Sequence, residues 1–526
     1  MRRLADQVGI LTLGSAAAVA VQLGVGIVLA RLFPAETFGS YLQVTMLVAT
    51  VSPILYLGIP SGLYYFLPAY TDGRREAVLV QAFGLLVVLG LCGSGALAVA
   101  ARPLAAALNN ADLAPAVARY GLALVGMLPA AAAHPLLVAM GRYRAATLVA
   151  AGIALGDGAV TVGAALVGAD LASLALSVAL VHLGVGTAVA GLVAAVVSRR
   201  PPRLRQVLDG RLLAAQLRYA VPFAASTHVG TIGRFLDRYI IGALYPPALF
   251  AVYAVGARQV PVVPLVLQSI GIVLQQRFTA LARDGRTAEV LPLWREAVRG
   301  QALLVLPLAV MLFVFAAPVV TLLYGERYLA SVPIFRVYLV LLALRIGTWP
   351  LVLTATGRTH TLLAGSVLSL LVSAGASLIL VQPMGLLGPA LGAALGPLAA
   401  AVFYVRRTAA VLGVSSRSLV PWREVGLIAA VAGAAALPVW PFASRFGEPL
   451  VLGLSALGYA GVLVGLACHV GVLRSADLAV VGRWLRRCPG EAGCGPEKPE
   501  QARARPLQSA ASRDAAPANS MAPPAP

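Results

Sequence analysis

Apolar runs about 20 residues long recur along most of this chain, and that length is what a helix needs to cross a bilayer. Hydrophobic residues make up 60% of the 526 positions and charged residues only 11%, whereas a soluble domain carries about 25% charged residues. The fold class is therefore expected to be all-α, a polytopic membrane protein. The runs predict fourteen transmembrane helices, near residues 8–30, 40–62, 77–101, 117–140, 145–167, 171–197, 216–242, 248–273, 298–323, 332–355, 361–381, 385–405, 424–443 and 449–472.

Arginine in the connections predicts the topology. The formal net charge is +20, and Lys498 is the only lysine. Arginines gather in alternate connections, such as 74–75, 142–144 and 199–211, while the connections near 168–170 and 244–247 have none. Under the positive-inside rule this alternation places both termini in the cytoplasm. Since the arginines are not collected in a soluble basic domain, no nucleic-acid partner is expected.

Two stretches of the chain repeat at a constant offset of 212 residues. The matches combine proline, aromatic and polar residues, which two apolar helices rarely share by chance. They pair Leu32 with Leu244, Pro34 with Pro246, Phe38 with Phe250, Tyr41 with Tyr253, and Asp72-Gly73-Arg74 with Asp284-Gly285-Arg286. The repeat spans an even number of helices, so both copies enter the membrane in the same direction. This predicts two parallel six-helix lobes related by an axis along the membrane normal, with substrate bound between them.

The predicted domain boundaries follow from this repeat and from the composition. The end of the chain is rich in proline and alanine and lacks apolar periodicity, which is typical of disorder. We expect a first lobe at 1–198, a cytoplasmic linker at 199–215, a second lobe at 216–410, an extra helix pair at 411–475 and a disordered cytoplasmic tail at 476–526.

Charged side chains inside the predicted helices are the candidate functional residues. Arg234, Asp237 and Arg238 lie close together on the helix at 216–242, and Arg258 and Arg345 lie in later helices of the second lobe. Such charge is costly in a membrane unless it faces a bundle interior or water. Guanidinium groups offer a planar fork of donors that suits phosphate oxygens. These five residues are the predicted binding site for an anionic substrate, with Asp237 able to pair with Arg234 or Arg238.

Two other arginines have a structural interpretation. Arg31 and Arg336 lie where they can bond to helix-end carbonyls or extend to the membrane surface. Prolines 261 and 264 follow Arg258 and should bend its helix, because proline removes a backbone hydrogen bond.

The second predicted helix is interrupted by Pro53, Gly58 and Pro60. Nearby tyrosines are either an interfacial belt or a platform for sugar rings, and the belt is the more common arrangement. These are Tyr56, Tyr64 and Tyr65.

Motifs for catalysis or cofactor binding are missing from the sequence. There is no H-E-x-x-H, no Walker lysine motif and no dinucleotide fingerprint, and the five histidines are dispersed. We therefore expect no enzymatic activity, no catalytic residue, no metal and no cofactor.

Four segments resemble bacterial polysaccharide-biosynthesis flippases of the multidrug/oligosaccharidyl-lipid/polysaccharide exporter superfamily. They are ARLFPAETFGSY (30–41), LGIPSGLYYFLP (57–68), DRYIIGALY (237–245) and FAVYAVGAR (250–258). The resemblance covers residues 1–410 and departs at Ala251, where the family tends to keep glycine. It implies two lobes around a cationic cavity and transfer of undecaprenyl-pyrophosphate-linked sugars to the periplasmic face of the inner membrane. Implied partners are the lipid-linked glycan, membrane lipids, and a glycan polymerase with other export components.

Other functions remain open at this point. A cation-coupled drug antiporter of the same superfamily would need a deep carboxylate, and Asp157 is the candidate for ion coupling. A flippase for a peptidoglycan precursor differs only in its substrate. A glycan polymerase or ligase would be expected to carry a large outside loop, and a membrane scaffold would not need buried charge.

Overall fold

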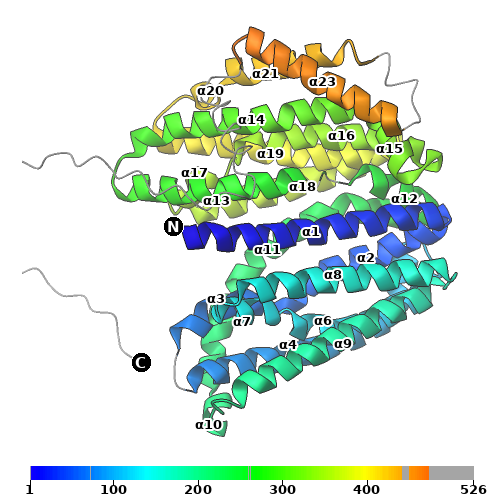
Figure 1. Cartoon of the computed structure of the whole chain (residues 1–526), viewed down its shortest axis with the longest axis vertical. Coiled ribbons are helices and arrows are strands. Elements are labelled where there is room, and N and C mark those ends of the chain that lie inside the picture. Colours follow the sequence, from blue (N-terminus) through cyan, green and yellow to red (C-terminus); the bar gives the residue numbers. More distant parts are fainter. Residues whose placement is uncertain (1, 71–72, 259, 261, 441–448, 473–526) are drawn as a thin grey trace, which may run out of the picture. The chain divides into compact units, whose positions relative to one another are not determined.

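The computed structural model describes residues 2–70, 73–258, 260, 262–440 and 449–472, and the regular elements in these ranges are all helices (Figure 1). The predicted tail at 476–526, together with Gln259 and Pro261, lies outside the described residues. The all-α fold class is confirmed for the described part of the chain.

The first half of the chain forms the predicted helices with several internal breaks. Its elements are α1 (Arg2–Leu32), α2 (Ala35–Tyr56), α3 (Ile59–Ala69), α4 (Arg74–Ala107), α5 (Leu113–Gly121), α6 (Ala123–Ala130), α7 (Ala133–Ala139), α8 (Tyr143–Leu166), α9 (Leu171–Val197) and the short α10 (Leu204–Val207). The break between α2 and α3 falls at Leu57 and Gly58, which both have positive φ, of 47° and 73°. The predicted interruption of this helix is therefore observed.

The second half follows the same plan and ends in an additional pair. Its elements are α11 (Gly210–Leu244), α12 (Pro247–Gly256), α13 (Val262–Arg283), η1 (Thr287–Glu289), α14 (Val290–Val314), α15 (Ala316–Tyr324), η2 (Glu326–Ser331), α16 (Val332–Ala343), η3 (Leu344–Gly347), α17 (Leu351–Ala355), α18 (Thr359–Met384), α19 (Leu387–Leu412), α20 (Ser416–Leu419), α21 (Trp422–Ala436) and α23 (Pro449–His469).

Matching positions of the two copies adopt matching backbone conformations. Pro34 and Pro246 are the N-caps of α2 and α12, with ψ of 150° and 159°. A proline at this place ends the preceding helix and fixes the direction of the next one. Gly141 and Gly357, which follow helices in the two halves, both have φ of 73°. These pairs support the repeat, while the lobe boundaries stay a prediction.

Each half packs mainly on itself. In the first, α1 packs on α8 and α6 packs on α9; in the second, α18 packs on α19 and α11 on α18. The terminal helices α21 and α23 pack on each other and on α14 (Figure 1). The halves meet where α2 packs on α12 and where α11 contacts α2 and α3.

Small residues permit this close approach, as is common between membrane helices. Gly39 of α2 lies so near the backbone carbonyl of Pro247 that a Cβ at position 39 would overlap with it. Ala251, its counterpart in the second copy, is fully buried and accommodates a methyl group. The departure from glycine at 251 is therefore compatible with the packing.

The count of fourteen membrane-spanning helices is not confirmed. Among the described residues, ten helices are long and apolar enough to cross a membrane, or eleven if the bent pair Leu113–Gly121 and Ala123–Ala139 is one span. The other three predicted ranges depart from a regular apolar span for visible reasons. Helix α11 carries several charges, α12 and α13 are separated by a break, and α21 has only 15 residues.

Candidate binding site

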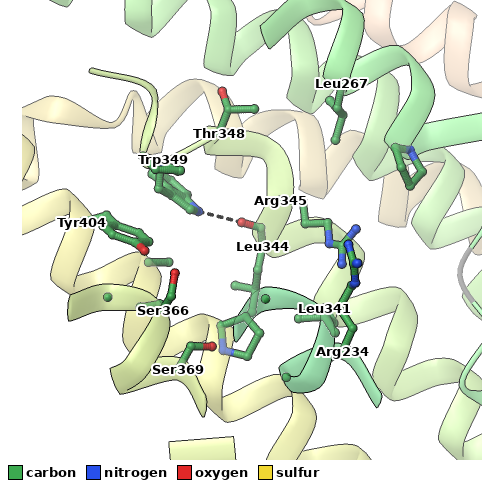
Figure 2. A pocket seen from close by; sticks show the side chains of 18 of the residues that line it. Arg234, Leu267, Leu341, Leu344, Arg345, Thr348, Trp349, Ser366, Ser369 and Tyr404 are labelled. Atoms are coloured by element: carbon green, nitrogen blue, oxygen red, sulfur yellow. Dashed lines mark hydrogen bonds between the residues drawn. The ribbon is translucent and has the colours of Figure 1, made fainter. Parts of the chain in front are cut away.

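A cavity with a volume of about 950 Å³ lies within the second half of the chain. Its walls come from α11, α13, the η3–α17 region, α18 and α19. Arg234 and Arg345 line it, together with Trp349, Tyr404 and a row of α18 serines (Figure 2). A volume of this size is in the range of small-molecule sites.

Arg234 projects from α11 into this cavity. Thr231 lies one turn earlier, and Arg234 Nη2 donates to its hydroxyl at 2.9 Å. Residues three apart lie on the same face of a helix, so the threonine orients the guanidinium while leaving its other donors available to the cavity.

Arg345 enters the cavity from a helix break. It belongs to the 3-10 turn Leu344–Gly347, and Thr348 directly after that turn has a positive φ of 36°. The side chains of Arg345 and Arg234 extend toward each other, and their guanidinium groups lie next to each other at one side of the cavity (Figure 2). Two like charges in this arrangement repel each other, and an anion between them would relieve the repulsion.

Asp237 also lines this cavity, and in the described part of the chain its partners are two tyrosines and not an arginine. The residue is buried, with 3% of its surface exposed. It accepts a hydrogen bond from the Tyr253 hydroxyl at 2.6 Å and another from the Tyr338 hydroxyl. The expected pairing with Arg234 or Arg238 is therefore wrong: two phenolic donors satisfy the carboxylate and leave both arginines to other partners.

Arg238 stabilises the break between α12 and α13. Its Nη2 donates to the carbonyl of Ala257, at 3.0 Å, and its guanidinium lies over the Phe235 ring at 5.5 Å. Ala257 follows the last residue of α12, where carbonyls lose their helical partners. Arg238 is not among the residues that line the large cavity, so the structure separates it from Arg234 and Arg345.

Arg258 lies in this break. The sequence predicts that it lies inside a helix, and that prediction is wrong. Its side chain faces the first half, where Nη2 donates to the carbonyl of Gln22 in α1 at 3.4 Å. It lines a second cavity, of about 620 Å³, formed mainly by α1, α2, α7, α8 and α9. Arg258 and Arg345 also line a much smaller space, of about 10 Å³, beside Tyr338.

Asp157 lies in the wall of this second cavity. One of its oxygens is 3.2 Å from Nε2 of His182 on α9. The predicted ion-coupling residue is thus spatially separate from the arginine cavity and has a titratable neighbour. In the described ranges, no group of three or more His, Cys, Asp or Glu residues is arranged to hold a metal ion.

The remaining predicted arginines bond to backbone carbonyls, as expected. Arg31 donates to the carbonyls of Leu322 and Leu323, in the last turn of α15. Arg336 donates to the carbonyl of Phe313 at 3.2 Å and lies over its ring. Both contribute to helix packing.

Several cavity residues could not be recognised in the sequence. Trp349 donates through Nε1 to the carbonyl of Leu344, at 2.8 Å, and the Tyr404 hydroxyl donates to the carbonyl of Leu362, at 2.9 Å. Ser366 and Ser369 face the same cavity from α18 (Figure 2). The two serines are three residues apart, which is compatible with one face of a helix. This spacing was the only feature of the sequence that could have indicated them.

Many apolar helices around cavities that contain a few charged side chains are typical of a multi-pass membrane protein of the transporter type. Residues 28–333 match the family described as polysaccharide biosynthesis protein. The chain therefore belongs to this family, as the sequence motifs suggested. No curated protein matches the chain.

Solved structures with the same fold are transporters and flippases. A structure titled lipid II flippase MurJ, inward closed conformation, is similar with a TM-score of 0.68 and 10% identity, over 90% of this chain and 100% of that one. An inward-facing multidrug resistance MATE transporter is similar with a TM-score of 0.59 and 16% identity, over 75% and 94%. A MOP superfamily transporter from Pyrococcus furiosus, whose title reports reverse polarity of its binding pocket, has a TM-score of 0.55 and 18% identity, over 77% and 95%.

Proposed function

We propose that the protein is a flippase that moves an undecaprenyl-pyrophosphate-linked oligosaccharide from the cytoplasmic to the periplasmic leaflet of the inner membrane. The observation that carries this proposal is the convergence of Arg234 and Arg345 in the large cavity (Figure 2). Pyrophosphate brings several anionic oxygens, and each guanidinium can engage two of them at once.

The rest of the cavity suits the lipid part of such a substrate. Most of its lining is apolar, including Leu267, Ile272, Leu341 and Leu370. A polyprenyl chain leaving the pyrophosphate would find apolar surface here and then bilayer beyond it, so little of it would have to enter water. Rocking of the two lobes about their contact would then expose the headgroup on the opposite side.

The orientation in the membrane follows from the arginine-rich connections. With both termini in the cytoplasm, the contact between α2 and α12 lies toward the periplasm, because Pro34 and Pro246 follow the first helix of each lobe. A protein closed at that end receives its substrate from the cytoplasmic side.

The test is binding of undecaprenyl pyrophosphate by the full-length protein in nanodiscs, together with glycan export in cells that lack their own copy. Arg234→Ala and Arg345→Ala should each weaken binding about tenfold or more, since a hydrogen bond to a charged group contributes about 1.5–3 kcal/mol. Arg336→Ala is the matched control, because that arginine bonds to Phe313 away from the cavity. Unchanged binding in both cavity variants would exclude this site.

One observation favours an ion-coupled antiporter as the second candidate. Asp157 and His182 form a pair that could exchange a proton, and the pair lies in a cavity. In that case transport of a cationic dye would depend on Asp157 and on the proton gradient, and the arginine variants would leave it unchanged. If the protein is instead a flippase for a peptidoglycan precursor, the binding assay should show tighter binding of undecaprenyl pyrophosphate that carries the sugars of that precursor than of the same lipid with other sugars.

A further inference from the structure

The second cavity differs in chemistry from the arginine cavity. It lies in the first half of the chain, and Arg258 is its only arginine among the described residues, contributed from the other half. Three tyrosines line it: Tyr41 and Tyr56 from α2, and Tyr120 from α5. Alanines of α6, α7 and α8 form much of the remaining wall, and these small side chains leave the space in front of the tyrosines open.

Hydrogen-bonding groups in this cavity are only partly used by the protein. Within the part of the chain that the structure describes, the hydroxyls of Tyr41 and Tyr120 have no hydrogen-bond partner, and Tyr56 has only a long contact of 3.5 Å to the carbonyl of Met127. Each tyrosine hydroxyl can both donate and accept a hydrogen bond. Three such groups around one space can therefore bind a ligand rich in hydroxyls.

Asp157 adds a carboxylate to the same wall. Its Oδ2 is occupied by His182 at 3.2 Å, whereas Oδ1 is buried without a hydrogen-bond partner in the described part of the chain. A buried polar atom without a partner costs about 1–3 kcal/mol. A small rearrangement that let a ligand hydroxyl reach Oδ1 would recover this loss, which favours a neutral ligand with donor groups over an anion.

The position of Arg258 connects the two cavities chemically. It lines the second cavity and, together with Arg345, the small space of about 10 Å³. Arg345 in turn lines the first cavity. A pyrophosphate bound by Arg234 and Arg345 would thus have Arg258 as its neighbour on the side of the second cavity, and the group attached to the second phosphate would be directed there.

We propose that the second cavity is the sugar compartment of the flippase, in which the first sugar residue of the lipid-linked glycan is bound by Tyr41, Tyr56, Tyr120 and Asp157. This inference rests on the proposed function. A volume of about 620 Å³ accommodates a sugar residue with its substituents. Aromatic rings present flat apolar faces to the ring hydrogens of a sugar, and the hydroxyls and the carboxylate bind its polar edge.

Of the tyrosines that the sequence offered as a sugar platform, only Tyr56 lines this cavity. The Tyr64 hydroxyl hydrogen-bonds to His134 Nδ1, and Tyr65 stacks on Tyr219 with a centroid separation of 5.0 Å. Tyr41 and Tyr120 also line the cavity, and nothing in the sequence indicated either residue. Tyr65 is therefore a matched control: it is a tyrosine of the same half whose ring lies outside the cavity.

The experiment measures binding of two probes to the full-length protein in nanodiscs. One probe is sugar-free undecaprenyl pyrophosphate, and the other is the undecaprenyl-pyrophosphate-linked sugar fraction extracted from membranes of the source organism. The wild-type protein should bind the sugar-bearing probe at least tenfold more tightly. Asp157→Asn and Tyr120→Phe should reduce this preference to less than threefold, with affinity for the sugar-free probe unchanged. Tyr65→Phe should behave as wild type.

Other binding results would overturn the sugar compartment or the proposed function itself. A wild-type protein without preference for the sugar-bearing probe, or cavity variants that retain the preference, would overturn the sugar compartment. Equal weakening of both probes by Asp157→Asn would overturn it too, since it would indicate a general structural role. Arg345→Ala should weaken both probes equally. A wild-type protein that binds neither probe would refute the proposed function itself, and with it this inference.

Discussion

The guanidinium of Arg258 lies directly against the backbone of Gly26, so that a Cβ at position 26 would overlap with its Nη1 atom. The same side chain donates to the carbonyl of Gln22, one turn earlier in α1. Gly26 corresponds to Arg238 at the offset of 212 residues. The first copy thus has a glycine where the second has an arginine, and the space is taken by an arginine from the other half.

Gly26→Ala should displace Arg258 without unfolding the protein, because the atom that must move is the end of a flexible side chain. We expect glycan export to fall about tenfold, which corresponds to roughly 1.4 kcal/mol, within the range for a charged hydrogen bond. The melting temperature in detergent should stay the same. Gly24→Ala is the control, since a Cβ there would meet nothing within 4 Å. Equal export by the two variants would show that the placement of Arg258 against α1 is unimportant.

Much of this arrangement could be expected from the sequence, and the missing parts have a common physical cause. The charged face of α11, the interruption after Tyr56 and the carbonyl bonds of Arg31 follow from local spacing, proline chemistry and the cost of burying charge. The partners of Asp237 do not, because Tyr253 and Tyr338 lie 16 and 101 residues away along the chain. The contact of Arg258 with Gln22 spans 236 residues. Tertiary packing determines such pairs, within the second half for Asp237 and between the halves for Arg258.

The count of fourteen helices is not confirmed, for a related reason. Periodicity and hydropathy identify apolar stretches, but they do not tell whether a stretch is one continuous span. The region around Arg258 joins two helices through a break, and the fourth predicted span is divided into α5, α6 and α7. Two of the proposed binding residues, Arg258 and Arg345, lie in such breaks, where backbone carbonyls and side chains can face a cavity.

Arg345→Lys tests whether geometry matters in the arginine cavity in addition to charge. Lysine keeps the positive charge but has no planar fork for two phosphate oxygens. We expect affinity for undecaprenyl pyrophosphate between that of the wild type and Arg345→Ala, with a loss of about 1 kcal/mol for the second hydrogen bond. Isothermal titration at two salt concentrations measures this. Wild-type affinity in the lysine variant would mean that binding depends on the positive charge alone and not on the planar fork of donors.

Tyr338→Phe should lower stability, because Asp237 would keep only one of its two phenolic donors. Loss of a hydrogen bond to a buried charged group costs about 1.5–3 kcal/mol. Tyr253→Phe should cost a similar amount. Combining either change with Asp237→Asn should restore part of the loss, since a neutral amide needs less stabilisation. Thermal unfolding of the purified protein measures each variant, and Tyr65→Phe serves as the surface control. An additive loss in the double variants would show that the hydroxyls do not act on Asp237.

Gly39→Ala should destabilise the contact between the halves. A Cβ at this position would overlap with the carbonyl of Pro247, which is backbone and cannot move without shifting α12. Overpacking of this kind costs about 1–3 kcal/mol. The matched control is Gly95→Ala in α4, where a Cβ meets nothing within 4 Å. Thermal unfolding should show a lower midpoint for the first variant alone, and equal midpoints would mean that α2 and α12 separate easily.

Arg299→Ala should detach the terminal helix pair from the rest of the second half. Arg299 of α14 is 6% exposed. It lies 3.3 Å from a Glu424 oxygen at the start of α21 and donates to the carbonyl of Val472, after α23, at 2.8 Å. Removing one partner from a buried ion pair typically costs about 3–5 kcal/mol, and the lower half of that range is expected here because Glu424 is partly exposed.

The comparison variant is Arg286→Ala, which breaks the exposed pair with Glu289 in the connection before α14. Exposed pairs contribute little to stability because water and salt screen them, so no change in the unfolding midpoint is expected. Limited proteolysis measures detachment directly: Arg299→Ala should expose the connection between α19 and α21 to cleavage, whereas Arg286→Ala should match the wild type. Equal resistance of both variants would show that apolar packing on α14 is sufficient to hold the terminal pair.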